Sequence, residues 1–66
     1  MQHPKVIQSR LLTMQEAAVY LNIPLNTLYK MVSQGKVPVV KINRLNRFDQ
    51  RLLDEWIKKN TRMPMY

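Results

Sequence analysis

Several polar side chains between residues 25 and 34 could form hydrogen bonds with nucleic-acid bases. Asn26, Thr27 and Lys30 have the spacing of residues on the outer side of one helix. Asparagine can form two hydrogen bonds with adenine, and lysine can donate to guanine. Tyr29 and Ser33 would also point outward, where they could reach the sugar-phosphate backbone. These residue types therefore predict base readout by the first three side chains.

Basic residues follow this stretch at close intervals. Lys41, Arg44 and Arg47 lie in a segment of alternating apolar residues, and Lys36 precedes it. Lysine and arginine bind phosphate mainly through charge, and arginine can also enter a narrow minor groove. These four cations predict contacts with the DNA backbone or a flanking groove. A sheet that only closes the hydrophobic core is the alternative interpretation.

The sequence lacks the residue groupings typical of an enzyme. Of the four acidic residues, Glu16 and Asp49 are expected to cap helices, and Asp54 and Glu55 are left without a nucleophile or metal ligand nearby. His3 has no partner at metal-ligand spacing. We therefore expect no catalytic activity, no cofactor and no bound metal.

The polar side chains need helices to hold them, and a capping box marks the first helix. Thr13 and Glu16 have the Ser/Thr-x-x-Glu spacing, in which each side chain can accept the other residue's backbone N–H. A helix is therefore predicted to begin at Met14. Asn22 suits its end, because asparagine tolerates the left-handed conformation. The apolar stripe of this helix would be Met14, Ala17, Ala18 and Leu21.

A second helix is predicted over Leu25 to Ser33 or Gln34. Pro24 fits its first position, where the missing N–H has no acceptor within the helix, and Gly35 supplies a left-handed stop. Two helices joined across so few residues must cross steeply, as in a helix-turn-helix, whose second helix enters the major groove of DNA. An ordinary helical hairpin within a core is the alternative. The inward stripe would be Leu28, Met31 and Val32.

Alternating apolar and polar residues replace helical spacing after Pro38 and predict a β-hairpin. Val40 and Ile42 would share one face of its first strand, and Asn43 suits a positive φ at the turn. Phe48 would lie on the return strand. A hairpin with basic residues at its tip and along its return strand is the arrangement called a wing.

A third helix is predicted over Gln50 to Lys59, with Asp49 as its N-cap. Trp56 is expected to be the core's largest side chain rather than a base-stacking residue. Residues 10–12 could add a short strand. The apolar stripe of this helix would be Leu52, Leu53, Trp56 and Ile57.

The predicted fold class is mainly α with a small β-hairpin, a winged helix-turn-helix of three helices plus a wing. This domain would cover residues 10–59. Residues 1–9 contain no clear periodicity and predict a flexible arm, and residues 60–66 predict a flexible tail.

Length and charge narrow the function further. A chain of 66 residues has room for one domain, and its net charge of +7 predicts a polyanionic partner. No apolar run approaches the ~20 residues that span a bilayer, so no membrane association is expected. The absence of cysteine favours a reducing compartment, and the expected location is the cytoplasm.

Residues 13–57 resemble the excisionase-like, MerR-related winged helix-turn-helix family. The resemblance rests on Glu16-Ala17-Ala18, Thr27-Leu28-Tyr29-Lys30, Gly35-Lys36-Val37-Pro38 and a basic hairpin before the last helix. It implies that the second helix lies in the major groove and that the wing contacts flanking backbone or minor groove. The family often begins the second helix with Ser-Arg, whereas this chain has Pro24-Leu25, which shifts the expected readout to Asn26, Thr27 and Lys30.

Two functions therefore remain in competition. The first is sequence-selective binding of double-stranded DNA by a mobile-element excisionase or a small transcription regulator, since the family includes both. The second is a protein-binding adaptor whose basic surface engages an acidic partner. A module this small buries little DNA surface, so self-association on adjacent sites, a recombinase or the transcription machinery would supply additional affinity.

Overall fold

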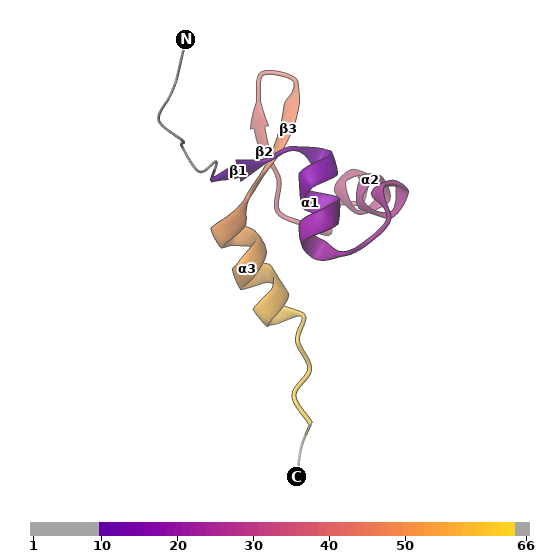
Figure 1. Ribbon diagram of the computed structural model, residues 1–66, viewed down its shortest axis with the longest axis vertical. Helices are drawn as coiled ribbons and strands as arrows, with labels where there is room; N and C mark the ends of the chain where they lie inside the picture. The colour runs from indigo at the N-terminus through magenta and orange to yellow at the C-terminus, as the bar shows by residue number, and fades with distance from the viewer. Residues whose placement is uncertain (1–9, 65–66) are drawn as a thin grey trace.

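The computed structural model describes residues 10–64, so the predicted arm over residues 1–9 and the end of the predicted tail lie outside it. The described residues form three short helices and a small sheet, arranged as in Figure 1. The predicted winged helix-turn-helix fold is confirmed. In chain order the elements are β1 (Leu11–Leu12), α1 (Met14–Leu21), α2 (Leu25–Ser33), β2 (Val40–Ile42), β3 (Leu45–Asp49) and α3 (Gln50–Lys59).

Both ends of α1 form as the sequence predicts. The Glu16 backbone N–H donates to Thr13 Oγ1 at 3.1 Å, and the Thr13 N–H donates to Glu16 Oε1 at 2.9 Å. Asn22 ends the helix in the left-handed conformation, with φ 58° and ψ 47°. Met14, Ala17 and Ala18 are buried. The capping box thus fixes where α1 starts and which of its faces enters the core.

The start of α2 differs from the prediction at one residue. Pro24 is the N-cap and not the first helical residue, because its ψ of 147° is extended. The left-handed Asn22 turns the chain, and the extended Pro24 leads into α2, with its carbonyl accepting the Leu28 N–H at 3.1 Å. At the other end, Gly35 has φ 69° and allows the Lys36 N–H to reach the Met31 carbonyl at 2.9 Å.

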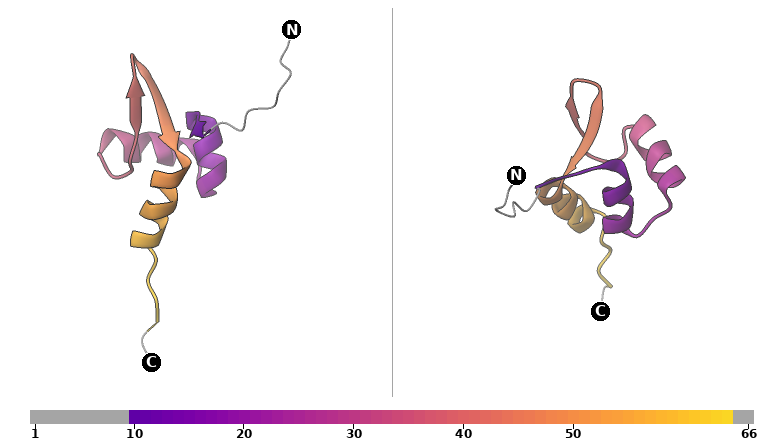
Figure 2. Two further views of the ribbon diagram at one scale, coloured as in Figure 1. Left: turned by 90° about the vertical axis from the view of Figure 1, so that its left-hand side faces the viewer. Right: turned by 45° about the horizontal axis from the view of Figure 1, so that its top comes forward.

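The three strands form one antiparallel sheet in the order β1-β3-β2. Its central strand β3 pairs with β1 through Phe48 and Asp49 and with β2 through residues 45–47. Strands β2 and β3 and the turn between them form the wing, with Asn43 at φ 57° in the turn. Figures 1 and 2 show the wing extending from the helices in the direction opposite to α3.

The core is small, and Trp56 is not at its centre. Its largest fully buried side chains are Phe48, Leu28 and Leu53. Trp56 is half-buried against this cluster, and its indole N–H donates to the Lys36 carbonyl at 3.0 Å. The prediction that Trp56 is the core's largest side chain is therefore wrong, because the indole keeps its polar edge where a backbone acceptor is available.

The apolar stripe predicted for α3 is also only partly buried. Leu53 is fully buried, whereas Leu52 and Ile57 are 42% and 40% exposed. One helix packed at the edge of so small a core can bury only a narrow face. The remaining apolar side chains of α3 are left at the surface.

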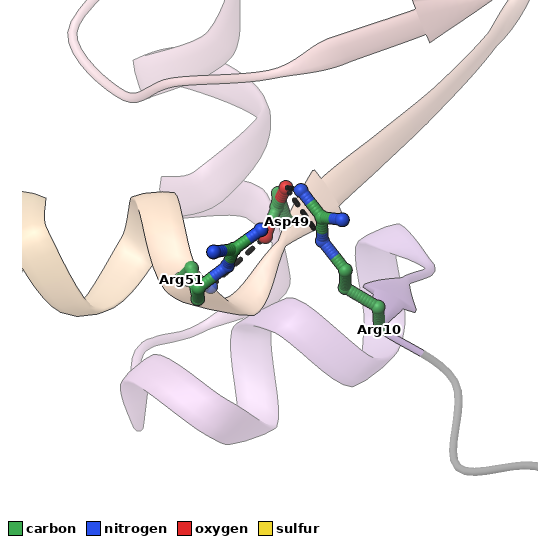
Figure 3. Close-up of polar contacts among 3 residues, drawn as sticks. All are labelled: Arg10, Asp49 and Arg51. Atoms are coloured by element: carbon green, nitrogen blue, oxygen red, sulfur yellow. Dashed lines mark hydrogen bonds and ion pairs between the residues drawn. The ribbon is translucent and has the colours of Figure 1, made fainter.

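Asp49 joins β1 to α3 (Figure 3). Its Oδ2 accepts from Arg10 Nη2 at 2.7 Å and from Arg10 Nε at 3.1 Å. Its Oδ1 accepts from the Arg51 backbone N–H at 2.9 Å, so the predicted N-cap is present. The hydrogen bond from Arg10 and, to a smaller degree, that from Arg51 hold the pKa of the Asp49 carboxyl below its ordinary value of 3.8, although burial opposes them.

Replacing Thr13 with alanine should lower the free energy of unfolding by about 1 kcal/mol, because the Glu16 N–H loses its acceptor. Urea unfolding followed by far-UV circular dichroism measures the change. Thr13→Ser is the matched control, since it keeps the hydroxyl and should stay close to wild type. Equal losses of unfolding free energy in Thr13→Ala and Thr13→Ser would show that the Thr13 hydroxyl does not stabilise α1.

Asp49→Asn should remove part of the protein's acid sensitivity while keeping the cap, because asparagine also accepts an N-terminal N–H. The pKa of Asp49 is lowered on folding, so its stabilisation is fully present above the unfolded pKa and is lost as the pH falls through the folded pKa. The stability gap between wild type and Asp49→Asn should therefore shrink as the pH falls below the pKa of an unfolded aspartate and through the lower folded pKa.

The matched controls for this prediction are Arg10→Gln and Glu55→Gln. Arg10→Gln should reproduce the gap at neutral pH, since it removes the same ion pair. Glu55→Gln removes a carboxyl of α3 for which the described structure shows no ion pair, and so controls for net charge. A gap that stays constant from neutral to acid pH would show that the ion pair contributes nothing.

Candidate nucleic-acid interface

The outer face of α2 carries a stripe of exposed polar side chains. Asn26, Tyr29, Lys30 and Ser33 are all exposed and stand at i, i+3, i+4 and i+7, which places them on one side of the helix. The opposite side of α2 holds the buried Leu28. The helix is thus fixed to the core by one face and presents hydrogen-bonding groups on the other.

Two of the predicted residues on α2 are less available than the sequence suggests. Thr27 was expected outside but is half-buried, because it stands beside the buried Leu28 at the edge of the inward face. The Ser33 hydroxyl donates to the Lys30 carbonyl at 2.9 Å, so its proton is used within the helix. Asn26 and Lys30 keep their side-chain polar groups free of partners within residues 10–64.

The cations of the wing differ in their freedom. Lys41 and Arg44 are exposed and have no side-chain partner in the described part of the chain. Arg47 is half-buried, and its Nη1 donates to the neighbouring Asn46 carbonyl at 2.9 Å. Lys36 is exposed just after α2. In the described structure, Lys41 and Arg44 are therefore the wing cations whose side chains have no partner within the chain.

The tip of the wing carries an exposed apolar pair that the predicted site did not include. Ile42 and Leu45 face each other across the two strands and are 45% and 52% exposed. The signal was available in the sequence, because a two-residue turn at Asn43 and Arg44 makes their flanking residues direct cross-strand neighbours. Such a pair can contact sugars or base edges in a shallow groove.

Acidic residues are absent from α2 and from residues 40–48. Glu16 and Asp49 act as caps, and Asp54 Oδ1 accepts from the Tyr20 hydroxyl at 2.6 Å. That hydrogen bond raises the pKa of Tyr20 above its ordinary value. The positive charge of α2 and the wing is therefore not offset locally.

Within residues 10–64, no group of His, Cys, Asp or Glu is arranged to hold a metal ion. None of the described helices has the length and hydropathy needed to cross a bilayer.

One known protein family matches most of the described residues. Residues 11–61, from β1 to just past α3, match the family described as Helix-turn-helix domain. No curated protein matches the chain.

Proposed function

The chain belongs to the helix-turn-helix domain family, and from this membership we propose that it binds double-stranded DNA with α2 in the major groove. The wing would lie on the flanking backbone or in the adjacent minor groove. The observation that supports this proposal is the exposed stripe of Asn26, Tyr29, Lys30 and Ser33 on a helix whose other face is fixed to the core.

Readout and affinity would come from different elements. Asn26 and Lys30 are exposed near the start and middle of α2, where side chains reach base edges, and Thr27 would add a contact through its outward edge. The remaining residues would contact the backbone or a second groove: Tyr29, Ser33, Lys36, Lys41, Arg44 and Arg47.

We further propose that the protein is a small excisionase-like or transcription-regulatory factor of the cytoplasm, with residues 10–59 as its DNA-binding domain. One copy covers little DNA, so adjacent copies, a recombinase or the transcription machinery would complete the complex. The resemblance of residues 13–57 to excisionase-like and MerR-related proteins supports this assignment.

Salt dependence is the first measurement. Five cations lie on α2, after it or on the wing, and five phosphate contacts predict a slope of about −4 to −5 in a plot of log K against log salt concentration. They are Lys30, Lys36, Lys41, Arg44 and Arg47. Anisotropy titrations of a labelled duplex between about 50 and 200 mM salt give this slope. A slope near zero would count against DNA as the partner.

Two variants separate readout from affinity. Asn26→Ala should cost roughly 1–3 kcal/mol on the preferred site and narrow its advantage over scrambled DNA. Arg44→Ala should weaken both duplexes together and reduce the salt slope by about one. The preferred site is first selected from a random duplex library, and each variant is then titrated on that site and on a scrambled duplex.

Matched controls lie outside the proposed interface. Gln15→Ala removes an exposed amide from α1, and Arg62→Ala removes an exposed cation beyond α3. Both should bind as wild type does. Loss of discrimination in Arg44→Ala, with discrimination intact in Asn26→Ala, would reverse the roles of helix and wing.

A further inference from the structure

An apolar groove lies between the corner that joins α1 to α2 and the end of α3. Its volume is about 320 Å³. The side chains that line it are mainly Leu21, Ile23, Met31, Trp56 and Ile57. A groove of this size is at the small end of ligand and peptide sites, and it can hold the anchor side chains of a docked segment.

The polar groups around this groove are satisfied within the chain. Asn60 Nδ2 donates to the Trp56 carbonyl at 2.8 Å, and Thr61 Oγ1 donates to the Ile57 carbonyl at 2.7 Å. The Trp56 indole N–H is bonded to the Lys36 carbonyl. The backbone at the end of α3 is therefore capped by side chains, and the groove mainly offers apolar contact.

Ile57 leaves apolar area exposed at this groove. It stands one helical turn after the fully buried Leu53 and remains 40% exposed, so the apolar stripe of α3 continues beyond the core. The domain itself gains little from an isoleucine at such a position, because much of the side chain stays in water. A partner that covers Ile57 would bury this apolar area and gain binding free energy from doing so.

The charges beside the groove favour an acidic occupant. Exposed cations follow its lining residues directly, with Lys58 after Ile57 and Arg62 after Thr61. Asp54 also lies close, one turn before Ile57, but its carboxylate accepts the Tyr20 hydroxyl proton. Over residues 54–62, which hold the end of α3 and the residues after it, the cations outnumber the acids by three (Lys58, Lys59 and Arg62) to two (Asp54 and Glu55).

We propose that this groove binds a partner protein through an amphipathic helical segment with apolar anchors and flanking acidic residues. Apolar anchors would fill the space beside Trp56 and Ile57, and the acidic residues would pair with Lys58 and Arg62. A helix laid in a groove uses residues spaced at i, i+3, i+4 and i+7 in this way. A second copy of this chain fits less well, because two molecules of net charge +7 repel each other.

The groove and the DNA-binding stripe lie on different faces. Met31 reaches the groove from the side of α2 that packs on the core, whereas Asn26 and Lys30 point outward. The wing extends in the direction opposite to α3, whose end forms the groove (Figure 1). One molecule can therefore hold the duplex and the partner at the same time.

Trp56 is the only tryptophan of the chain, so its fluorescence reports directly on the groove. The probe is a synthetic helical peptide without tryptophan, with leucine on one face and glutamate on the other. The control peptide has lysine in place of every glutamate. The glutamate peptide should shift Trp56 emission to shorter wavelength and bind at least about tenfold more tightly than the lysine peptide.

Ile57→Lys and Leu52→Lys form a matched pair, because both residues lie on α3 with nearly equal exposure. Ile57→Lys should weaken the glutamate peptide about tenfold, whereas Leu52→Lys should leave it unchanged. Ile57→Thr keeps the branched shape and should weaken binding to a smaller degree, which guards against misfolding of the lysine variant. Thermal unfolding of each variant checks the fold.

Peptide binding in the presence of duplex DNA tests whether the groove is independent of the DNA-binding stripe on α2. The peptide should bind equally well to the free protein and to protein saturated with duplex, and failure to bind DNA at all would leave the peptide result intact. Displacement by duplex, equal binding of both peptides, or an unaffected Ile57→Lys variant would overturn the proposal. If the protein dimerised without peptide and Ile57→Lys abolished the dimer, the groove would bind a second copy of the chain, and the proposal would also be overturned.

Discussion

The end of β3 is the junction on which the wing, the core and α3 all depend. Phe48 pairs with Leu12 in the sheet and fills the centre of the core. Asp49 follows it at once, pairs with Leu11, binds Arg10 and caps α3. Because these two residues are adjacent, the strand that carries the wing cannot shift its register without exposing Phe48 and removing the cap of α3. The direction of the wing is thus tied to the most buried point of the protein.

The positions of the acidic residues explain how so basic a chain keeps its positive surface free. Glu16 and Asp49 are used as caps, and Asp54 binds a tyrosine hydroxyl. Each of these acids stabilises a helix end or a contact between helices, and none lies on α2. These three acids therefore serve folding, while the cations of α2 and the wing remain available to a polyanion. Folding and binding draw on separate sets of charged residues.

The parts of this structure that the sequence predicts are those with local signals. Thr13 and Glu16 mark the start of α1, Asn22 and Gly35 mark helix ends, and alternation after Pro38 predicts the wing. Each signal acts within a few residues, so no knowledge of packing is needed. The half-burial of Trp56 and Thr27 and the exposure of Ile57 were not predictable, because helical periodicity indicates which residues share a face but not how much of that face the neighbouring elements cover. The residue set proposed for DNA contact follows from the exposed face of α2 and the basic hairpin. The structure adds that the Ser33 hydroxyl and the Arg47 guanidinium each donate a hydrogen bond to a backbone carbonyl of the chain.

Small size imposes the remaining constraint. A domain whose residues 10–64 include only three fully buried large side chains cannot build a deep pocket there, so recognition by this part of the chain must use its outer faces. One face, on α2 and the wing, is polar and basic; another, between the α1–α2 corner and α3, is apolar with cations at its edge. A single short helix reading DNA gives a modest affinity, because the buried interface is small. A partner held in the groove and itself attached to the same DNA would raise the effective concentration of the module at its site without any further contact between α2 and the bases. The two faces would then act together, with sequence preference set by α2 and much of the affinity supplied by the partner.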